Sequence, residues 1–174
     1  TTTVVLELHA RGHLRLDDRI AEFLAEWRGT DREEVTVRDL LEHASGLPAR
    51  LLDQPPVTRR EFEHDICTVA LAHAPRMAAL YSDLGFILLG FLSADRGQAS
   101  LADQFDALWR RLADTSGHGP SGRELLEFTP LPVRRTETAP TLPLEVDPRR
   151  GRTLIAEVHD NYAAALGGVA GHAG

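Results

Sequence analysis

The sequence lacks lysine altogether, so all 19 of its positively charged side chains are arginine, and it has one cysteine among 174 residues. That residue, Cys67, excludes an internal disulfide and a cysteine-based zinc cluster. The longest apolar run, around residues 84–92, is far shorter than the roughly 20 residues that a membrane span requires. The net charge is −7 with no block of five like charges, which excludes the basic surface of a nucleic-acid-binding protein. The remaining composition, 43% hydrophobic and 26% charged, is typical of a globular domain or part of one.

The chain begins with TTTVVLEL, which has the pattern of the interior of a structural element. It shows neither an initiator methionine nor a signal-peptide pattern. We therefore expect the intact polypeptide to have residues before Thr1. The compartment stays open, because an export signal would belong to those earlier residues.

Residues 1–114 are predicted to form a helical region, because apolar residues recur there at spacings of three and four. Thr36 with Asp39, and Thr58 with Glu61, have the pattern of capping boxes at helix starts. We expect six helices, which cover about residues 3–11, 17–27, 35–48 and 58–75, then a stretch that follows Ser82-Asp83, and finally residues 100–112.

The amino-acid composition changes after residue 114. Ten of the 24 glycine and proline residues lie between 115 and 151, so we expect an irregular loop region there. TLIAEV, residues 153–158, mixes β-branched and polar residues and is predicted to form a strand. Residues 152–174 would then return toward a sheet. Such a long irregular stretch usually wraps a site or another part of the protein.

The triplet Tyr81-Ser82-Asp83 stands directly before an apolar helical run. A phenol has an ordinary pKa of about 10, so it exchanges protons near neutral pH only when a nearby cation favours the phenolate. Ser82 or Asp83 would cap the helix and fix the direction of the phenol. From the residues alone two interpretations stay open: Tyr81 carries protons, or it is a half-buried residue that packs at the helix start.

The eight histidines suggest a metal site only weakly. His9 and His13 are four residues apart, but Gly12 between them weakens the helix. His159, Asp160 and His172 lie near the end of the chain without the HExxH pattern of a zinc hydrolase. The final GGVAGHAG lacks the spacing of a phosphate-binding loop, and no serine fits a GxSxG motif.

Four stretches, in order, resemble the serine hydrolases of the β-lactamase and penicillin-binding-protein superfamily. They are RGHLRLDDRIAEFL, VTVRDLLEHASGLP, YSDLGFILLG and EVHDNYAAALGGVAGHAG. The similar branch contains class C β-lactamases, D-alanyl-D-alanine carboxypeptidases and related esterases. The resemblance implies an α+β fold of the β-lactamase/transpeptidase type. Residues 1–174 would be a central, partial domain of that fold, mainly its helical part, with one or two strands near the C-terminus.

In this family a Ser-x-x-Lys motif supplies the nucleophile, a Tyr-x-Asn motif shares the proton transfer, and a Lys/His-Thr-Gly strand completes the oxyanion pocket. Only the middle motif is present, so the resemblance implies catalytic roles for Tyr81 and Asp83 and a substrate-binding role for Ser82. It implies a small-molecule or peptide substrate, no cofactor and no metal. We expect the other two motifs to lie before and after this segment.

Asp83 departs from the usual asparagine of that motif. Asparagine both donates and accepts hydrogen bonds, whereas an ionised aspartate only accepts. We expect this change to favour esters or peptides over β-lactams.

Two functional hypotheses follow. The first is a segment of a serine hydrolase that acts by acyl transfer on an amide or ester, inactive without the missing nucleophile. The alternative is a non-catalytic pseudoenzyme or binding module made of the helical part alone. The oligomeric state stays open in both.

Overall fold

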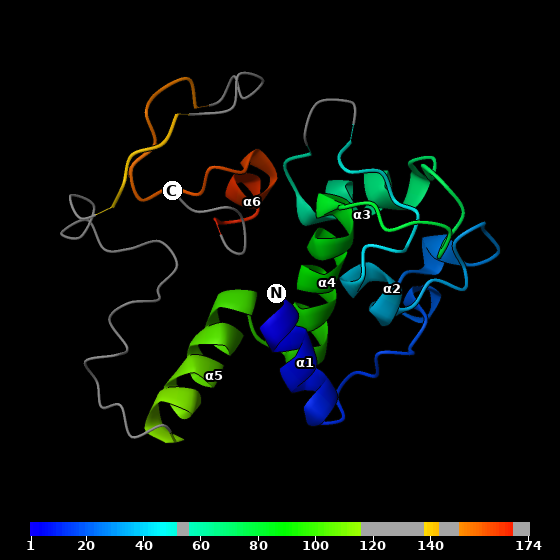
Figure 1. The fold of residues 1–174 in the computed structure, drawn as a ribbon, viewed down its shortest axis with the longest axis horizontal. Coiled ribbons are helices and arrows are strands. Elements are labelled where there is room, and N and C mark those ends of the chain that lie inside the picture. The colour runs from blue at the N-terminus through cyan, green and yellow to red at the C-terminus, as the bar shows by residue number, and fades with distance from the viewer. Residues whose placement is uncertain (52–55, 116–137, 143–149, 169–174) are drawn as a thin grey trace. The chain divides into compact units, whose positions relative to one another are not determined.

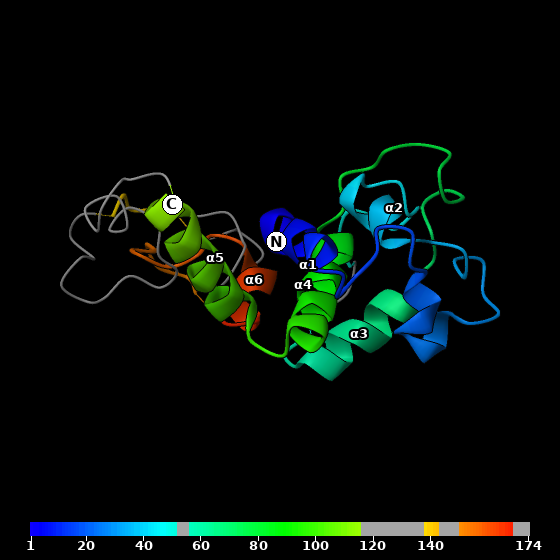
Figure 2. The same ribbon diagram turned by 90° about the horizontal axis from the view of Figure 1, so that it is seen from below.

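The computed structural model describes residues 1–51, 56–115, 138–142 and 150–168. Figures 1 and 2 show the ribbon from two directions. The chain divides into two units, one formed by Thr1–Gln54 and Arg59–Phe105 and the other by Pro55–Thr58 and Asp106–Gly174. None of the described helices is both long and apolar enough to cross a membrane.

The described residues are mainly helical, as the sequence predicted. The first unit contains α1 (Thr2–Ala10), the 3-10 turns η1 (Ile20–Glu22) and η2 (Ala25–Trp27), α2 (Val37–Leu41), α3 (Arg59–Thr68) and α4 (Asp83–Gly97). Helix α5 (Leu101–Thr115) begins in the first unit and continues into the second, which also contains the short α6 (Asn161–Ala165).

Helix α4 is the centre of the first unit, because α1, α2 and α3 all contact it. Leu84, Leu88, Leu89 and Leu92 of α4 are buried, as are Val4, Val5 and Leu8 of α1. Burial of this kind stabilises the folded chain by about 1.5–3 kcal/mol for each large side chain. Cys67 of α3 is also buried, and burial raises the pKa of its thiol to about 11.

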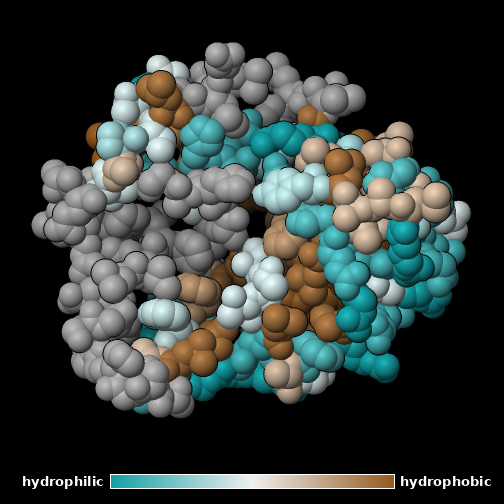
Figure 3. Space-filling view, in the orientation of Figure 1, coloured by the Kyte–Doolittle hydropathy of each residue, from teal (hydrophilic) through white to brown (hydrophobic). Residues whose placement is uncertain are grey.

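Helices α1 and α4 lie side by side in both views (Figures 1 and 2). Arg96, in the last turn of α4, donates a hydrogen bond of 2.8 Å to the carbonyl of His13, three residues beyond the end of α1. The C-terminal ends of the two helices therefore adjoin, and their N-terminal ends point the same way. Hydrophobic side chains gather over α1 and α4 on the face shown in Figure 3, and Leu6 of α1 is 46% exposed.

The prediction of an α-helix over 17–27 was wrong, because this segment forms only the turns η1 and η2. Most of its internal backbone hydrogen bonds join residues three apart, and further backbone groups bond to a distant segment. Ile20 donates to the carbonyl of Val35 at 2.9 Å, and Val37 donates to the carbonyl of Asp18 at 3.1 Å. The Asp18 carbonyl is therefore not bonded to the N–H of Glu22, as it would be in an α-helix, and Glu22 donates to Arg19 instead.

Two other helices are shorter than predicted. The helix expected over 35–48 ends at Leu41, and His43 follows it with a φ of +55°. The helix expected to reach residue 75 ends at Thr68, where the Arg32 guanidinium donates to the carbonyl of Val69 at 2.8 Å. The chain then bonds to another loop, as Ala72 donates to the carbonyl of Gly46 at 2.9 Å.

The strand predicted over 153–158 is absent from the described residues. Thr141 and Leu154 form a single antiparallel bridge, and Ala156 has a φ of +56°, which interrupts an extended backbone. Helix α6 was not predicted. Its start is capped by Asp160, whose carboxylate accepts the backbone N–H of Ala163 at 2.7 Å. The division at residues 114 and 151 stays a prediction.

The capping box at the start of α2 is confirmed. The Thr36 side chain accepts the N–H of Asp39, and the Asp39 carboxylate accepts the N–H of Thr36 at 2.8 Å. The guanidinium of Arg76 also donates two hydrogen bonds to this carboxylate, from Nε to Oδ1 at 2.9 Å and from Nη2 to Oδ2 at 2.7 Å. Asp39 therefore joins the start of α2 to the loop that precedes Tyr81.

The ionisation of Asp39 should make stability depend on pH. Burial opposes the charge, but hydrogen bonds from Arg76 and Thr36 outweigh it and hold the pKa of the carboxyl below its ordinary value. Unfolded Asp39 takes up a proton near about pH 3.9, and folded Asp39 does so only at a lower pH. The unfolded chain thus binds more protons in this window, so the free energy of unfolding falls as the pH is lowered through it.

Asp39→Asn is expected to lower the free energy of unfolding by about 1.5–3 kcal/mol at pH 7, the range for hydrogen bonds to a charged group. The loss should shrink between about pH 5 and 3, because wild type then gives up the contribution that the variant already lacks. Urea unfolding of both proteins across this range measures the difference. Parallel pH curves would show that Asp39 is not the group responsible.

Candidate functional site

Tyr81 ends the loop that connects α3 to α4 and stands two residues before the first turn of α4. Its side chain is exposed, with 58% of the residue's surface accessible, and its ring centre lies 4.8 Å from that of His43. The ring is therefore not buried against aliphatic side chains, which is the arrangement that would have reduced this triplet to packing.

Ser82 is the N-cap of α4, as the sequence predicted. Its hydroxyl donates to the carbonyl of Pro48 at 2.7 Å and accepts the N–H of Gly85 at 3.4 Å. The residue is almost fully buried. The hydroxyl thus fixes the start of α4 on the segment after α2, and a contact with substrate stays a prediction.

Asp83 is the first residue of α4, where a negative charge interacts favourably with the helix dipole. Its carboxylate accepts a hydrogen bond from the Arg50 guanidinium at 3.0 Å, and its backbone N–H donates to the carbonyl of Ala49 at 3.1 Å. The side chains of Asp83 and Arg50 are 19% and 39% exposed. The negative charge of Asp83 is therefore balanced by an arginine from a distant loop.

His43 was missed as a site residue, although it lies within the quoted stretch VTVRDLLEHASGLP. Its carbonyl accepts the N–H of Leu80 at 3.0 Å, and its Nδ1 accepts the N–H of Ser82 at 3.1 Å. Its ring also stacks on Phe86, with centres 4.9 Å apart and planes inclined by 20°. One residue thus holds the peptide groups on both sides of Tyr81.

Two further contacts fix the loop that ends at Tyr81. Gly46 has a φ of +84°, and a Cβ there would overlap the carbonyl oxygen of His73. Arg76, with a φ of +66°, donates its N–H to the carbonyl of Ala44 at 2.7 Å. The loop before Tyr81 and the loop after α2 are therefore packed backbone to backbone.

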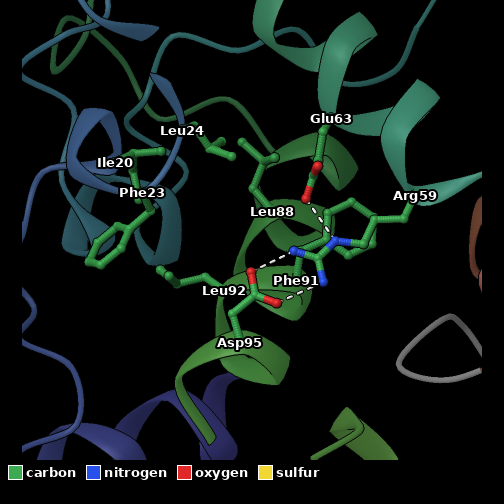
Figure 4. Close-up of a pocket in the computed structure, with 9 residues that line it drawn as sticks. All are labelled: Ile20, Phe23, Leu24, Arg59, Glu63, Leu88, Phe91, Leu92 and Asp95. Atoms are coloured by element: carbon green, nitrogen blue, oxygen red, sulfur yellow. Dashed lines mark hydrogen bonds and ion pairs between the residues drawn. The ribbon is translucent and has the colours of Figure 1, made fainter. Parts of the chain in front are cut away.

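A shallow pocket of about 30 Å³ lies elsewhere on the first unit, among α3, α4 and the turn η1 (Figure 4). The Arg59 guanidinium bridges Glu63 and Asp95 across it, at 2.7 Å from the Glu63 carboxylate, and lies over the ring of Phe91. This volume accommodates only one or two water molecules. The pocket is a small gap beside the ion pairs of Arg59, and none of the predicted site residues lines it.

No group of three or more histidine, cysteine, aspartate or glutamate side chains could hold a metal among the described residues. His9 interacts through Nδ1 with the carbonyl of Leu14 at 3.2 Å. Asp160 caps α6, and the carbonyl of His159 accepts a hydrogen bond from Arg150 at 2.9 Å. His172 lies outside the described residues.

Comparison with known proteins places these features in a family. A family model described as Beta-lactamase matches residues 1–173. A "Putative D-alanyl-D-alanine carboxypeptidase" of Escherichia coli (strain K12) is 28% identical over the whole chain, which spans 44% of that relative's length.

Solved structures give the same result for the fold. The beta-lactamase/D-alanine carboxypeptidase from Yersinia pestis, complexed with citrate, matches with a TM-score of 0.61 and 19% identity over 99% of this chain and 46% of that one. A class C beta-lactamase matches with a TM-score of 0.51 and 24% identity over 59% of this chain and 28% of its own. These likenesses show the β-lactamase/transpeptidase type of fold that the sequence predicted.

Proposed function

The chain belongs to the beta-lactamase family, and we propose that it is the central, helical part of a serine hydrolase that acts by acyl transfer on an amide or ester. The observation that carries this proposal is the state of Tyr81, which is exposed and yet held at the start of α4 on both sides. A residue whose only role is packing would be buried, whereas Tyr81 is exposed although the backbone on both sides of it is hydrogen-bonded to His43.

The proposed role of Tyr81 is proton transfer. The Tyr81 phenolate takes the proton of a serine hydroxyl as that serine attacks the substrate carbonyl, and the resulting phenol then delivers this proton to the leaving group. A neighbouring ammonium lowers the pKa of a phenol by favouring its charged form. The serine and the amine belong to a motif outside these 174 residues, since the chain contains no lysine.

The arrangement of α1 and α4 supports a position for that motif. The two helices run in the same direction with their C-terminal ends adjoining, and α4 has 15 residues against nine in α1. At a rise of about 1.5 Å per residue, the difference in length is about 9 Å. A continuation of α1 before Thr1 by one to two turns would therefore reach the level of Tyr81.

Covalent labelling tests the proposal. A fluorophosphonate or a labelled penicillin is expected to acylate or phosphonylate the full-length protein and to leave the 174-residue chain unmodified, because the chain lacks the activated serine. Mass spectrometry of the modified peptide identifies the residue. Labelling within these 174 residues contradicts the proposed place of the nucleophile, and a full-length protein that resists both reagents favours the binding-module alternative.

We further propose that Asp83 directs substrate preference toward esters or peptides. Its carboxylate adds a negative charge and lacks the N–H of asparagine, so it cannot donate to a substrate amide. Asp83→Asn in the full-length protein should raise the ratio of β-lactam to ester turnover by about tenfold, which corresponds to one hydrogen bond of about 1.4 kcal/mol.

A matched control for this change is Asp95→Asn. Asp95 lies in the same helix and also pairs with an arginine, Arg59, but it belongs to the separate pocket of Figure 4. It should leave the substrate ratio unchanged. An equal shift in both variants, or none in Asp83→Asn, would count against a role for Asp83 in substrate choice.

A further inference from the structure

We infer that His43 is the positioning residue of Tyr81: it sets the place and direction of the phenol without itself contacting substrate. This inference rests on the proposed function of Tyr81. It begins from the backbone, where the N–H groups of Leu80 and Ser82, on either side of Tyr81, both donate to His43. One acceptor is the main-chain carbonyl and the other is the imidazole Nδ1, so only the second depends on the side chain.

The hydrogen bond from Ser82 also determines the tautomer of the His43 imidazole. Because Nδ1 accepts an N–H, it carries no proton, and the hydrogen of the neutral ring is on Nε2. The Ser82 amide is buried with its residue, so it would lack a partner if this acceptor were removed. The imidazole therefore completes the hydrogen bonding of the turn into α4.

The ring faces of His43 provide the second half of the argument. The imidazole centre lies 4.8 Å from the Tyr81 ring and 4.9 Å from the Phe86 ring. Phe86 belongs to the first turn of α4, so the imidazole connects the exposed phenol to a fixed helical turn. Ring contacts at this separation favour particular relative orientations, and they restrict the directions that the Tyr81 side chain can take.

His43 has a side chain at a position where the backbone conformation favours glycine. It follows the C-cap of α2 with a φ of +55°, a conformation in which glycine is usual at helix ends. A residue with a Cβ is less favourable there by about 1–2 kcal/mol. An imidazole that anchors Ser82 and contacts Tyr81 offsets this strain.

The same φ provides clean variants for a test. His43→Gly removes the imidazole while relieving the backbone strain, so it should fold. His43→Asn also tolerates this φ and retains an acceptor at the place of Nδ1, the Oδ1 atom, but it lacks the ring. In the full-length protein, His43→Gly should lower kcat about 10- to 100-fold with KM within about threefold, because small misplacement of a reacting group has effects of this size. His43→Asn should recover at least about fivefold of that loss.

A double-mutant cycle separates positioning from an independent role. If His43 acts through the phenol, His43→Gly should change kcat less than about twofold in a Tyr81→Phe background. A loss as large as in wild type would overturn the inference. So would unchanged kcat in His43→Gly alone, given that the wild-type protein is labelled by a fluorophosphonate.

Hydrogen exchange tests the hydrogen bond from Ser82 to His43 without a measurement of enzyme activity. The Ser82 amide should exchange at least about tenfold faster in His43→Gly than in wild type or His43→Asn, because it loses its acceptor. Equal exchange rates in all three proteins would contradict the inference even if the enzyme is active. Failure of both the fluorophosphonate and the labelled penicillin to modify wild type would instead count against the proposed function, and the exchange rates would still report on His43.

Discussion

Tyr81→Phe in the full-length protein is expected to lower kcat by about 10²- to 10⁴-fold, the range that a positioned acid–base group contributes. KM should change little, because the variant loses only the hydroxyl and keeps the ring that contacts His43. Since Tyr81 is exposed, the thermal midpoint should also stay within about 2 °C of wild type. Steady-state kinetics and thermal unfolding of the same preparations measure both effects.

The matched control is the other tyrosine of the chain, Tyr162, which is buried in α6. Tyr162→Phe should affect the thermal midpoint more than kcat, which is the opposite pattern. Should Tyr81→Phe retain wild-type kcat, the phenol does not transfer protons in the rate-limiting step, and the proposed mechanism fails for this residue.

Gly46→Ala is expected to produce the largest loss of stability among single methyl additions in the first unit. Alanine at a φ of +84° is strained by about 1–2 kcal/mol. Its Cβ would also overlap the His73 carbonyl oxygen, which is backbone and cannot rotate away. Overpacking of this kind adds about 1–3 kcal/mol. The total loss should be about 2–5 kcal/mol in the free energy of unfolding, measured by urea denaturation.

Gly12→Ala provides the control, because Gly12 has a similar φ of +74° with open space around the new Cβ. It should lose only the conformational part, about 1–2 kcal/mol. Gly46→Ala should in addition lower kcat in the full-length protein, since it separates the two loops that hold Tyr81. Equal losses in the two variants would mean that the packing of these loops does not limit stability.

The features that the sequence predicted correctly are those set by neighbouring residues. The capping box of Thr36 and Asp39 and the N-cap at Ser82 each depend on residues within three positions, and all are present. The inward face of α1 follows from helical spacing alone. Local chemistry was therefore sufficient to place Tyr81 at the start of a helix.

The errors arise where backbone groups bond to distant segments. Residues 17–27 have the spacing of an amphipathic helix, but the Ile20 N–H bonds to the distant Val35 and only the short turns η1 and η2 form. The predicted strand over 153–158 is interrupted by the positive φ of Ala156, which no local pattern indicates. Spacing describes which face is apolar, but it does not show where hydrogen bonds find their partners.

The candidate site was predicted only in part for the same reason. The triplet was recognised as a unit, but Arg50 and His43 are 33 and 39 residues away from the residues that they contact. The helix was expected to continue past His43, so the position of this residue directly after α2 became visible only in the structure. Nothing in the spacing indicated the partner of Asp83.

The most direct test of the central claim is a crystal structure of the full-length protein with its nucleophile covalently labelled by a fluorophosphonate. The quantity to measure is the distance between the Tyr81 Oη and the Oγ of the labelled serine. The proposed mechanism predicts about 2.6–3.2 Å, hydrogen-bond reach for proton transfer, with a lysine amine beside both atoms. A labelled residue beyond the reach of Tyr81, with no water bridging the two, would contradict it.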